Sequence, residues 1–211
     1  MLKSFDIPKR FKNKTINNYD PDRLSNQNNP YKKVKEYIEN YEKMDDEGNW
    51  LVLTGGYGLG KTHLALAAGR EILKFYAKEY VKDNPRNYRF LGGRKKAIFI
   101  NSSELVQEIR DSYDNDMIDE RTVMERYKGV ELLIIDDLGT EKASDWQHEK
   151  MYLILNYRYE ECKNTIITTN LNTTELKKQV SERVVERMIE ASAGGEYLWK
   201  LKGESYRRSN N

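Results

Sequence analysis

The chain has 211 residues, a single cysteine and a formal net charge of only +2, from 36 lysine and arginine residues against 34 acidic ones. A chain of this length can bury about 70% of its unfolded surface, so it needs neither disulfides nor a structural metal for stability. The single cysteine, Cys162, excludes a disulfide framework and a zinc knuckle, and it favours a reducing, cytoplasmic compartment. The near-neutral charge excludes a surface that is basic throughout, so any contact with nucleic acid is expected to be a local patch.

The sequence carries no pattern of membrane insertion or export. No run approaches the roughly 18 apolar residues that a spanning helix needs. The N-terminus lacks the apolar segment and the cleavage site of a secretory signal. We therefore expect no membrane partner.

The first 30 residues differ in character from the segment that follows. Residues 1–30 are rich in Asn, Lys, Asp and Pro and show little periodicity, which predicts an extended arm, either wrapped on a domain or partly disordered. Hydrophobic residues at helical spacing then predict a helix over 31–43. The apolar run at 50–54 ends in glycines and is typical of a buried parallel strand. We expect 31–211 to form one domain.

Strands and helices alternate through the rest of the chain. Helical patterns cover 64–75, 103–128 in two short pieces, 145–161 and 181–190, and apolar runs predict strands at 97–100, 132–135, 165–169 and 197–201. Asn101 is placed to cap the helix that follows the second strand, with Glu104 in the capping-box position. The alternation predicts an α/β fold in three layers, with a five-stranded parallel sheet between helices.

A phosphate-binding motif follows the first strand. Residues 55–62 match G-x-x-x-x-G-K-[ST] at every fixed position, between a strand and a helix as this motif requires. The glycines let backbone amides turn toward a β-phosphate, and the start of the helix adds its partial positive charge. We expect Lys61 to face solvent and bridge the β- and γ-phosphates, and the Thr62 hydroxyl to bind Mg²⁺. The alternative, a glycine-rich turn that matches the motif by chance, does not account for the flanking strand and helix. The expected nucleotide-binding residues of the loop are Gly55, Gly56, Tyr57, Gly58, Leu59, Gly60, Lys61 and Thr62.

Acidic and amide side chains follow two later strands. Asp136 and Asp137 come directly after the strand at 132–135, at the edge where parallel sheets bind ligands. A carboxylate there holds the waters of a metal ion and polarises the attacking water in phosphoryl transfer. Asn170 ends the next strand, where its amide would orient a water or touch the γ-phosphate. Taken alone, each of these residues is also compatible with an ordinary polar strand end.

These residues carry a resemblance to a known family. Over nearly its whole length the chain resembles the AAA+ ATPase domain of the bacterial DnaC/DnaI helicase loaders and of the related IstB transposition helpers. The phosphate loop alone is generic, but the Ile-Asp-Asp-Leu-Gly-Thr-Glu segment and the E-R-V-x-x-R-M box are specific. The similar segments are Ile7–Phe11, Gly55–Thr62 followed by His63 and Leu64, Leu133–Glu141, Ile167–Asn170, Glu182–Met188 and Gly203–Arg207. The resemblance implies a P-loop NTPase of AAA+ type that uses ATP and Mg²⁺.

The resemblance also implies roles for residues at the nucleotide. Asp136 takes the place of the Walker B acid that holds Mg²⁺ together with Thr62, and Asp137 takes the place of the catalytic glutamate. Asn170 matches the residue known as sensor 1. His63 belongs with the nucleotide-binding residues.

Arginines near the C-terminus have implied roles as well. Arg187 resembles the arginine finger that reaches ATP on a neighbouring subunit, and Arg207 matches a C-terminal sensor arginine. Arg183 lies one turn before Arg187 on the same helix face. One interpretation is therefore that the two arginines share or exchange these roles. Solvated charges on a helix are the alternative for both.

Some features depart from the family. Its loaders usually carry an N-terminal domain that grips the replicative helicase, and nothing in this sequence corresponds to it. Either the chain is a natural minimal form, for example from a phage, or the arm and the ATPase surface contact the helicase. The long loop at 82–96 combines six basic residues with Tyr88 and Phe90, which fits a single-stranded DNA contact or a solvated insertion. Residues 101–128 stand where initiator-type AAA+ proteins carry a helical insertion, and a core or subunit contact is the favoured role for them.

The sequence leaves several functions open. One is a slow ATPase that self-associates with ATP and loads a hexameric replicative helicase on single-stranded DNA. Another is an IstB-like transposition helper, and a third is an ATP-switched DNA-binding module with negligible turnover. Because the side chain of Asp137 is one methylene shorter than glutamate, we expect slow hydrolysis.

Overall fold

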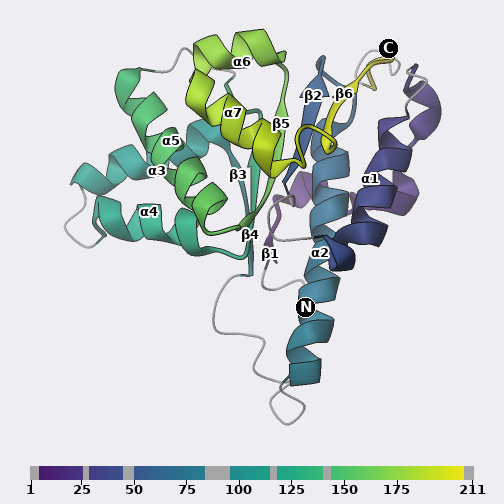
Figure 1. Cartoon of the computed structure of the whole chain (residues 1–211), viewed down its shortest axis with the longest axis horizontal. Helices are drawn as coiled ribbons and strands as arrows, with labels where there is room; N and C mark the ends of the chain where they lie inside the picture. Colours follow the sequence, from purple (N-terminus) through teal and green to yellow (C-terminus); the bar gives the residue numbers. More distant parts are fainter. Residues whose placement is uncertain are drawn as a thin grey trace.

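The computed structural model describes residues 5–25, 29–44, 50–83, 96–114, 118–139 and 144–206. Its centre is a parallel sheet with the strand order β1-β3-β4-β5-β2-β6 (Figure 1). The strands are β1 (Phe5–Asp6), β2 (Leu51–Gly55), β3 (Ala97–Asn101), β4 (Leu132–Asp136), β5 (Asn164–Thr169) and β6 (Leu198–Leu201). Each neighbouring pair of strands is parallel. The predicted α/β architecture is thus confirmed, and all five predicted strands are present.

Helices cover both faces of this sheet. They are α1 (Pro30–Asn40), α2 (Lys61–Asp83), α3 (Ser102–Asp111), α4 (Glu120–Gly129), α5 (Asp145–Glu160), α6 (Thr173–Gln179) and α7 (Glu182–Ala191). Helices α1 and α2 lie on one face and α3 to α7 on the other, which gives the predicted three layers (Figure 1). The central strands alternate between the two cores: Leu51 and Leu53 pack toward α2, and Val52 packs toward the opposite helices.

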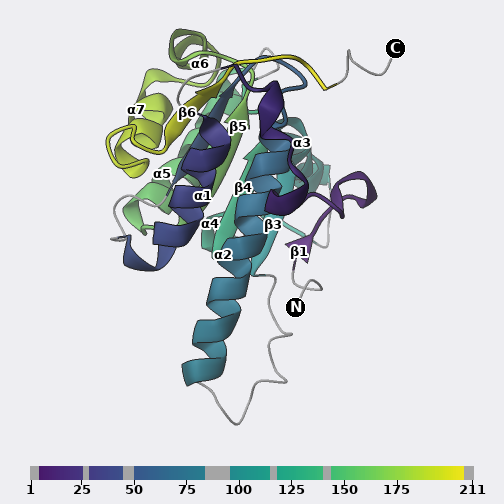
Figure 2. The same cartoon turned by 90° about the vertical axis from the view of Figure 1, so that its right-hand side faces the viewer.

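The arm packs on the domain and contains regular elements that the sequence pattern did not predict. It begins with β1, which pairs with β3 and adds a sixth strand to the sheet. Short 3-10 turns follow at Lys9–Phe11, Ile16–Asn18 and Pro21–Arg23. Figure 2 shows the arm crossing in front of α2. Arg70 on α2 contacts the arm, because its guanidinium donates to the carbonyl of Lys12. A strand of only two residues carries no apolar run, so the sequence pattern did not reveal it.

Two helices also differ from expectation. Helix α6 was not predicted, although Asn172 and Glu175 form the capping box that starts it. Helix α2 continues to Asp83, so the first two residues of the expected basic loop at 82–96 belong to a helix. Most of that loop, 84–95, lies outside the described residues. Helices α3 and α4 and the turn Ser112–Asp114 lie within the predicted helical segment at 101–128, and Asn101 caps α3 by accepting from the Ser103 amide.

A buried arginine joins the N-terminal ends of β4 and β5 to the C-terminus of helix α4. Arg158 on α5 is fully buried, and its guanidinium donates to the carbonyls of Tyr127, Lys128 and Val130 at 2.9, 3.0 and 2.8 Å. Its Nε also donates to the Thr165 hydroxyl at 3.0 Å. Carbonyls at a helix C-terminus lack partners within the helix, so Arg158 satisfies groups that would otherwise be buried without a hydrogen bond.

Candidate nucleotide-binding site

The phosphate loop joins β2 to α2 with a backbone that only glycines adopt easily. Gly58 and Gly60 have φ angles of +76° and +84°. At Gly60 there is also no room for a side chain, because an added Cβ would lie 2.6 Å from Cε2 of Tyr19. The loop therefore needs glycine here both for its backbone conformation and for the close approach of the arm.

Lys61 was expected to face solvent, but it lies inside the loop. Lys61 is only 5% exposed. The ammonium group donates to the carbonyls of Gly55 and Gly56, each at 2.8 Å, and to Oδ1 of Asn170 at 2.7 Å. The β2–α2 and β5–α6 connections are thus joined through one cation at the carboxyl edge of the sheet.

Thr62 and Asp136 lie next to each other and are the candidate oxygen ligands of a metal ion. The Thr62 hydroxyl lies 2.9 and 3.1 Å from the two carboxylate oxygens of Asp136, and the Thr168 hydroxyl donates to Oδ1 at 2.6 Å. Burial raises the pKa of Asp136, while the hydroxyl of Thr168 acts in the opposite direction. Mg²⁺ prefers one or two protein oxygens together with waters and phosphates, so this pair fits Mg²⁺. The described residues contain no cluster of three acidic, histidine or cysteine side chains that would form a closed metal site.

Asp137 is held by the neighbouring strand. It has a φ of +55°, its amide donates to the Thr168 hydroxyl at 3.0 Å, and the Ser102 hydroxyl donates to its carbonyl at 3.0 Å. Nδ2 of Asn170 donates to its carboxylate at 2.9 Å. Asn170 therefore contacts Lys61 through its oxygen and Asp137 through its nitrogen. The structure brings these predicted site residues together, and the catalytic role of each stays a prediction.

A cleft of about 1040 Å³ opens over these groups. Its floor contains the loop, both carboxylates and Asn170, while Asn101 and Glu104 contribute from the start of α3. The arm forms another wall, together with Phe99 of β3 and Tyr206 near the C-terminus, and the sequence did not predict this wall. The arm residues that line the cleft are Pro8, Arg10, Phe11, Lys14, Asn18 and Asp20.

His63 contacts the arm. Its Nε2 lies 2.8 Å from the Thr15 carbonyl and 2.9 Å from Oδ1 of Asn18. Both partners are acceptors, so Nε2 carries the proton and donates to them. Burial lowers the pKa of His63, which favours this neutral form. His63 lines the cleft as expected of a nucleotide-binding residue, and its hydrogen bonds also fix the position of the arm.

The two expected arginines have different outcomes. Arg187 lies on α7, on the opposite face of the sheet from α2, and it is not part of the cleft lining. Its guanidinium stacks 4.4 Å from the ring of Tyr159 and pairs with Glu190 at 2.9 Å. Arg183 is exposed on the same helix. Arg207 lies outside the described residues. Within one chain, then, Arg187 does not reach the nucleotide cleft, and its role as a finger acting on a neighbour stays a prediction.

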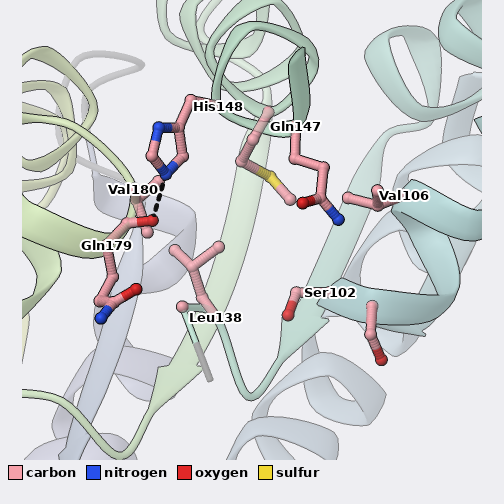
Figure 3. Close-up of a pocket in the computed structure, with 10 residues that line it drawn as sticks. Ser102, Val106, Leu138, Gln147, His148, Gln179 and Val180 are labelled. Atoms are coloured by element: carbon pink, nitrogen blue, oxygen red, sulfur yellow. Dashed lines mark hydrogen bonds between the residues drawn. The ribbon is translucent and has the colours of Figure 1, made fainter. Parts of the chain in front are cut away.

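A second, much smaller cavity lies on the α5 side of the sheet (Figure 3). It has a volume of about 40 Å³ and lies between Ser102, Leu138, Met151 and Val180. His148 lies at its rim, with Nε2 2.6 Å from the Gln179 carbonyl. A space of this size holds a water molecule or two and is too small for a cofactor.

No helix in the described ranges is long and apolar enough to cross a membrane.

Comparison with known proteins identifies the family. A model of the bacterial DnaA ATPase domain matches residues 25–192. The chain belongs to this ATPase family. Within it, the chain is a DnaC/DnaI-like AAA+ domain, as the resemblance implied. It is 32% identical over 179 residues to the phage-like element PBSX protein XkdC of Bacillus subtilis, with 82% of this chain and 58% of that protein covered. It is 27% identical over 184 residues to the replicative helicase loader DnaC of Escherichia coli, with 86% and 64% covered.

Solved structures agree with this assignment. The crystal structure of the DnaC helicase loader matches with a TM-score of 0.70 and 27% identity, over 92% of this chain and all of that one. The AMPPCP-bound DnaA of Aquifex aeolicus matches with a TM-score of 0.62 and 25% identity, over 89% of this chain and 50% of that one. The chain spans only about 60% of the length of the two curated relatives (58% and 64%). The activity of those whole proteins is therefore a proposal for this one.

Proposed function

We propose that the protein is an ATP-dependent AAA+ ATPase of DNA replication that acts as a DnaC/DnaI-like loader of a hexameric replicative helicase. The observation that carries the proposal is the polar chain at the sheet edge, in which Asn170 links Lys61 to Asp137 while Thr62 pairs with Asp136. These are the groups that phosphoryl transfer from a nucleoside triphosphate requires. The match to an AMPPCP-bound DnaA supports ATP as the nucleotide.

The residues divide the work of hydrolysis between them. Lys61 and the amides of the loop bind the phosphates, and Thr62 and Asp136 would hold Mg²⁺, which neutralises charge on the phosphate oxygens when bound. Asp137 is the candidate that orients the attacking water and accepts its proton, with Asn170 fixing its carboxylate. Its short side chain supports slow turnover.

The proposed partners follow from the relatives. DnaC is named as a replicative helicase loader, which supports a helicase partner for this chain. The exposed side of α7 carries Arg183 and Arg187, and self-association that depends on ATP would bring such an arginine to the cleft of a neighbour. Single-stranded DNA is the proposed nucleic-acid partner, and the loop at 82–96 is its proposed contact.

One experiment separates this proposal from the alternatives. The full chain is immobilised with ATP and Mg²⁺ and offered the purified replicative helicase or a DNA duplex, with Lys61→Ala as the control that lacks nucleotide binding. If the wild type captures the helicase and Lys61→Ala does not, the result supports a helicase loader. Capture of duplex DNA without the helicase refutes it in favour of an IstB-like helper. ATP-dependent capture of DNA with no phosphate release in a parallel assay refutes it in favour of a switched binding module.

A further inference from the structure

The arm and the C-terminal segment both hold the phosphate loop from outside. The hydroxyl of Tyr19 in the arm donates to the carbonyl of Leu59 at 2.9 Å. On the preceding peptide unit, the amide of Tyr206 donates to the carbonyl of Gly58 at 2.9 Å. The Tyr206 hydroxyl in turn donates to the carbonyl of Asp20, which joins the C-terminal segment to the arm. Two successive carbonyls of the loop are thus held by segments far away in the sequence.

The orientation of these carbonyls fixes the orientation of the loop amides. In a trans peptide unit the C=O and the following N–H point in opposite directions. The described residues contain no cis peptide bond. Because Tyr206 holds the Gly58 carbonyl, the Leu59 amide points away from Tyr206. In the same way, because Tyr19 holds the Leu59 carbonyl, the Gly60 amide points away from Tyr19. Inward-turned amides at these positions are what a phosphate loop offers to a β-phosphate.

Tyr19 is fixed in this place by its surroundings. It is 5% exposed and stacks on Tyr31 with ring centres 5.6 Å apart and an angle of 8° between the planes. It makes a T-shaped contact with the His63 ring, with ring centres 5.2 Å apart, and it fills the space that a side chain at Gly60 would need. Burial raises the pKa of its hydroxyl far above the usual value, so the group stays a donor at every physiological pH. Tyr19 lies outside the lining of the cleft, so it acts on the loop and not on the ligand.

We propose that Tyr19 is a positioning residue of the phosphate loop. By holding the Leu59 carbonyl from behind, its hydroxyl keeps the Gly60 amide turned toward the phosphates of a bound nucleotide. The arm is thereby part of the nucleotide-binding machinery. This inference rests on the proposed function only in requiring that the loop binds a nucleotide.

The test compares tyrosine hydroxyls on adjacent rings. Tyr19→Phe keeps the ring against Gly60 and removes only the donor. Tyr31→Phe is the matched control, because its hydroxyl makes no hydrogen bond with the described residues. Dissociation constants for ADP and for ATP with Mg²⁺ are measured by calorimetry, and unfolding temperatures are measured without nucleotide. Tyr206→Phe is a second variant: it keeps the amide that donates to Gly58 and removes the hydroxyl that joins the C-terminal segment to Asp20 of the arm, so it loosens the arm that carries Tyr19.

We expect Tyr19→Phe to raise the dissociation constants for ADP and for ATP by the same factor, roughly threefold to tenfold, which corresponds to the loss of one hydrogen bond. The factor is shared because both nucleotides carry the β-phosphate. Tyr31→Phe should stay within twofold of the wild type, and Tyr206→Phe should weaken both nucleotides in the same direction. If Tyr19→Phe lowers the unfolding temperature but leaves both constants within twofold, the hydroxyl only stabilises the fold and the inference is wrong. A loss confined to ATP would also overturn it. Failure of the wild type to bind either nucleotide would refute the proposed function instead.

Discussion

Replacing Lys61 by alanine tests the nucleotide site most directly. The ammonium group is placed by the carbonyls of Gly55 and Gly56 at the floor of the loop, where the phosphate-loop motif predicts that it binds the β- and γ-phosphates. A hydrogen bond to a charged group contributes about 1.5–3 kcal/mol, so the loss of two such contacts amounts to roughly 3–6 kcal/mol. The dissociation constant for ATP should therefore rise by about two to four orders of magnitude.

The fold should survive this change. Lys61→Ala leaves the Asn170 oxygen and two carbonyls without their donor, but it also removes the cost of burying a charge, and the two effects partly cancel. We expect the free energy of unfolding to change by less than about 2 kcal/mol. Lys74→Ala is the matched control, since Lys74 is on the same helix with a side chain 57% exposed. Calorimetric titration with ATP decides the matter. If Lys61→Ala binds within tenfold of the Lys74→Ala control, the assignment of the loop is wrong.

Other substitutions test the carboxylates and the buried arginine. Asp137→Asn should retain ATP binding and lose turnover, whereas Asp136→Asn should weaken binding only when Mg²⁺ is present, because the two carboxylates have different partners. Equal losses of binding in titrations with and without Mg²⁺ would contradict this division. Arg158→Met should lower the free energy of unfolding in urea by roughly 3 kcal/mol, since it leaves buried carbonyls without donors, and Arg158→Lys should lose less. A loss below about 1 kcal/mol for Arg158→Met would show that water replaces the guanidinium.

The sequence predicted those parts of the site that follow from strand order and spacing. A parallel strand brings its carboxyl end to one edge of the sheet, so Asp136, Asp137 and Asn170 were expected to lie near the phosphate loop. The register confirms that Asn101 pairs with Asp136 across β3 and β4. Asp136 and Asp137 directly follow the apolar run at 132–135, and short apolar runs that alternate with helical patterns indicate buried parallel strands.

The contacts made by the arm could not be predicted in this way. Tyr19 reaches Leu59 across 40 positions of the sequence through a segment without periodicity, so no local pattern indicates the pairing. Polar residues such as Asn18 and Thr15 are typical of loops, and only the folded chain shows that they meet His63. Lys61 was expected to face solvent because the motif does not show that Asn170 and the loop carbonyls enclose it.

Arg187 offers the sharpest test of assembly. Within its own chain the guanidinium pairs with Glu190 over Tyr159, and its side chain is 37% exposed, so it is available at the surface of α7. A planar, permanently charged fork suits γ-phosphate oxygens, and a finger supplied by a neighbour contributes a factor of about 10³ or more in rate. Arg187→Ala should therefore bind ATP normally yet lose hydrolysis and ATP-dependent association. Mixing it with Lys61→Ala should restore some activity, because one interface then pairs an intact loop with an intact finger. If the mixture stays inactive while both variants are folded, and Arg187→Ala still associates with ATP, the finger is not Arg187, and Arg183 on the same helix becomes the residue to replace.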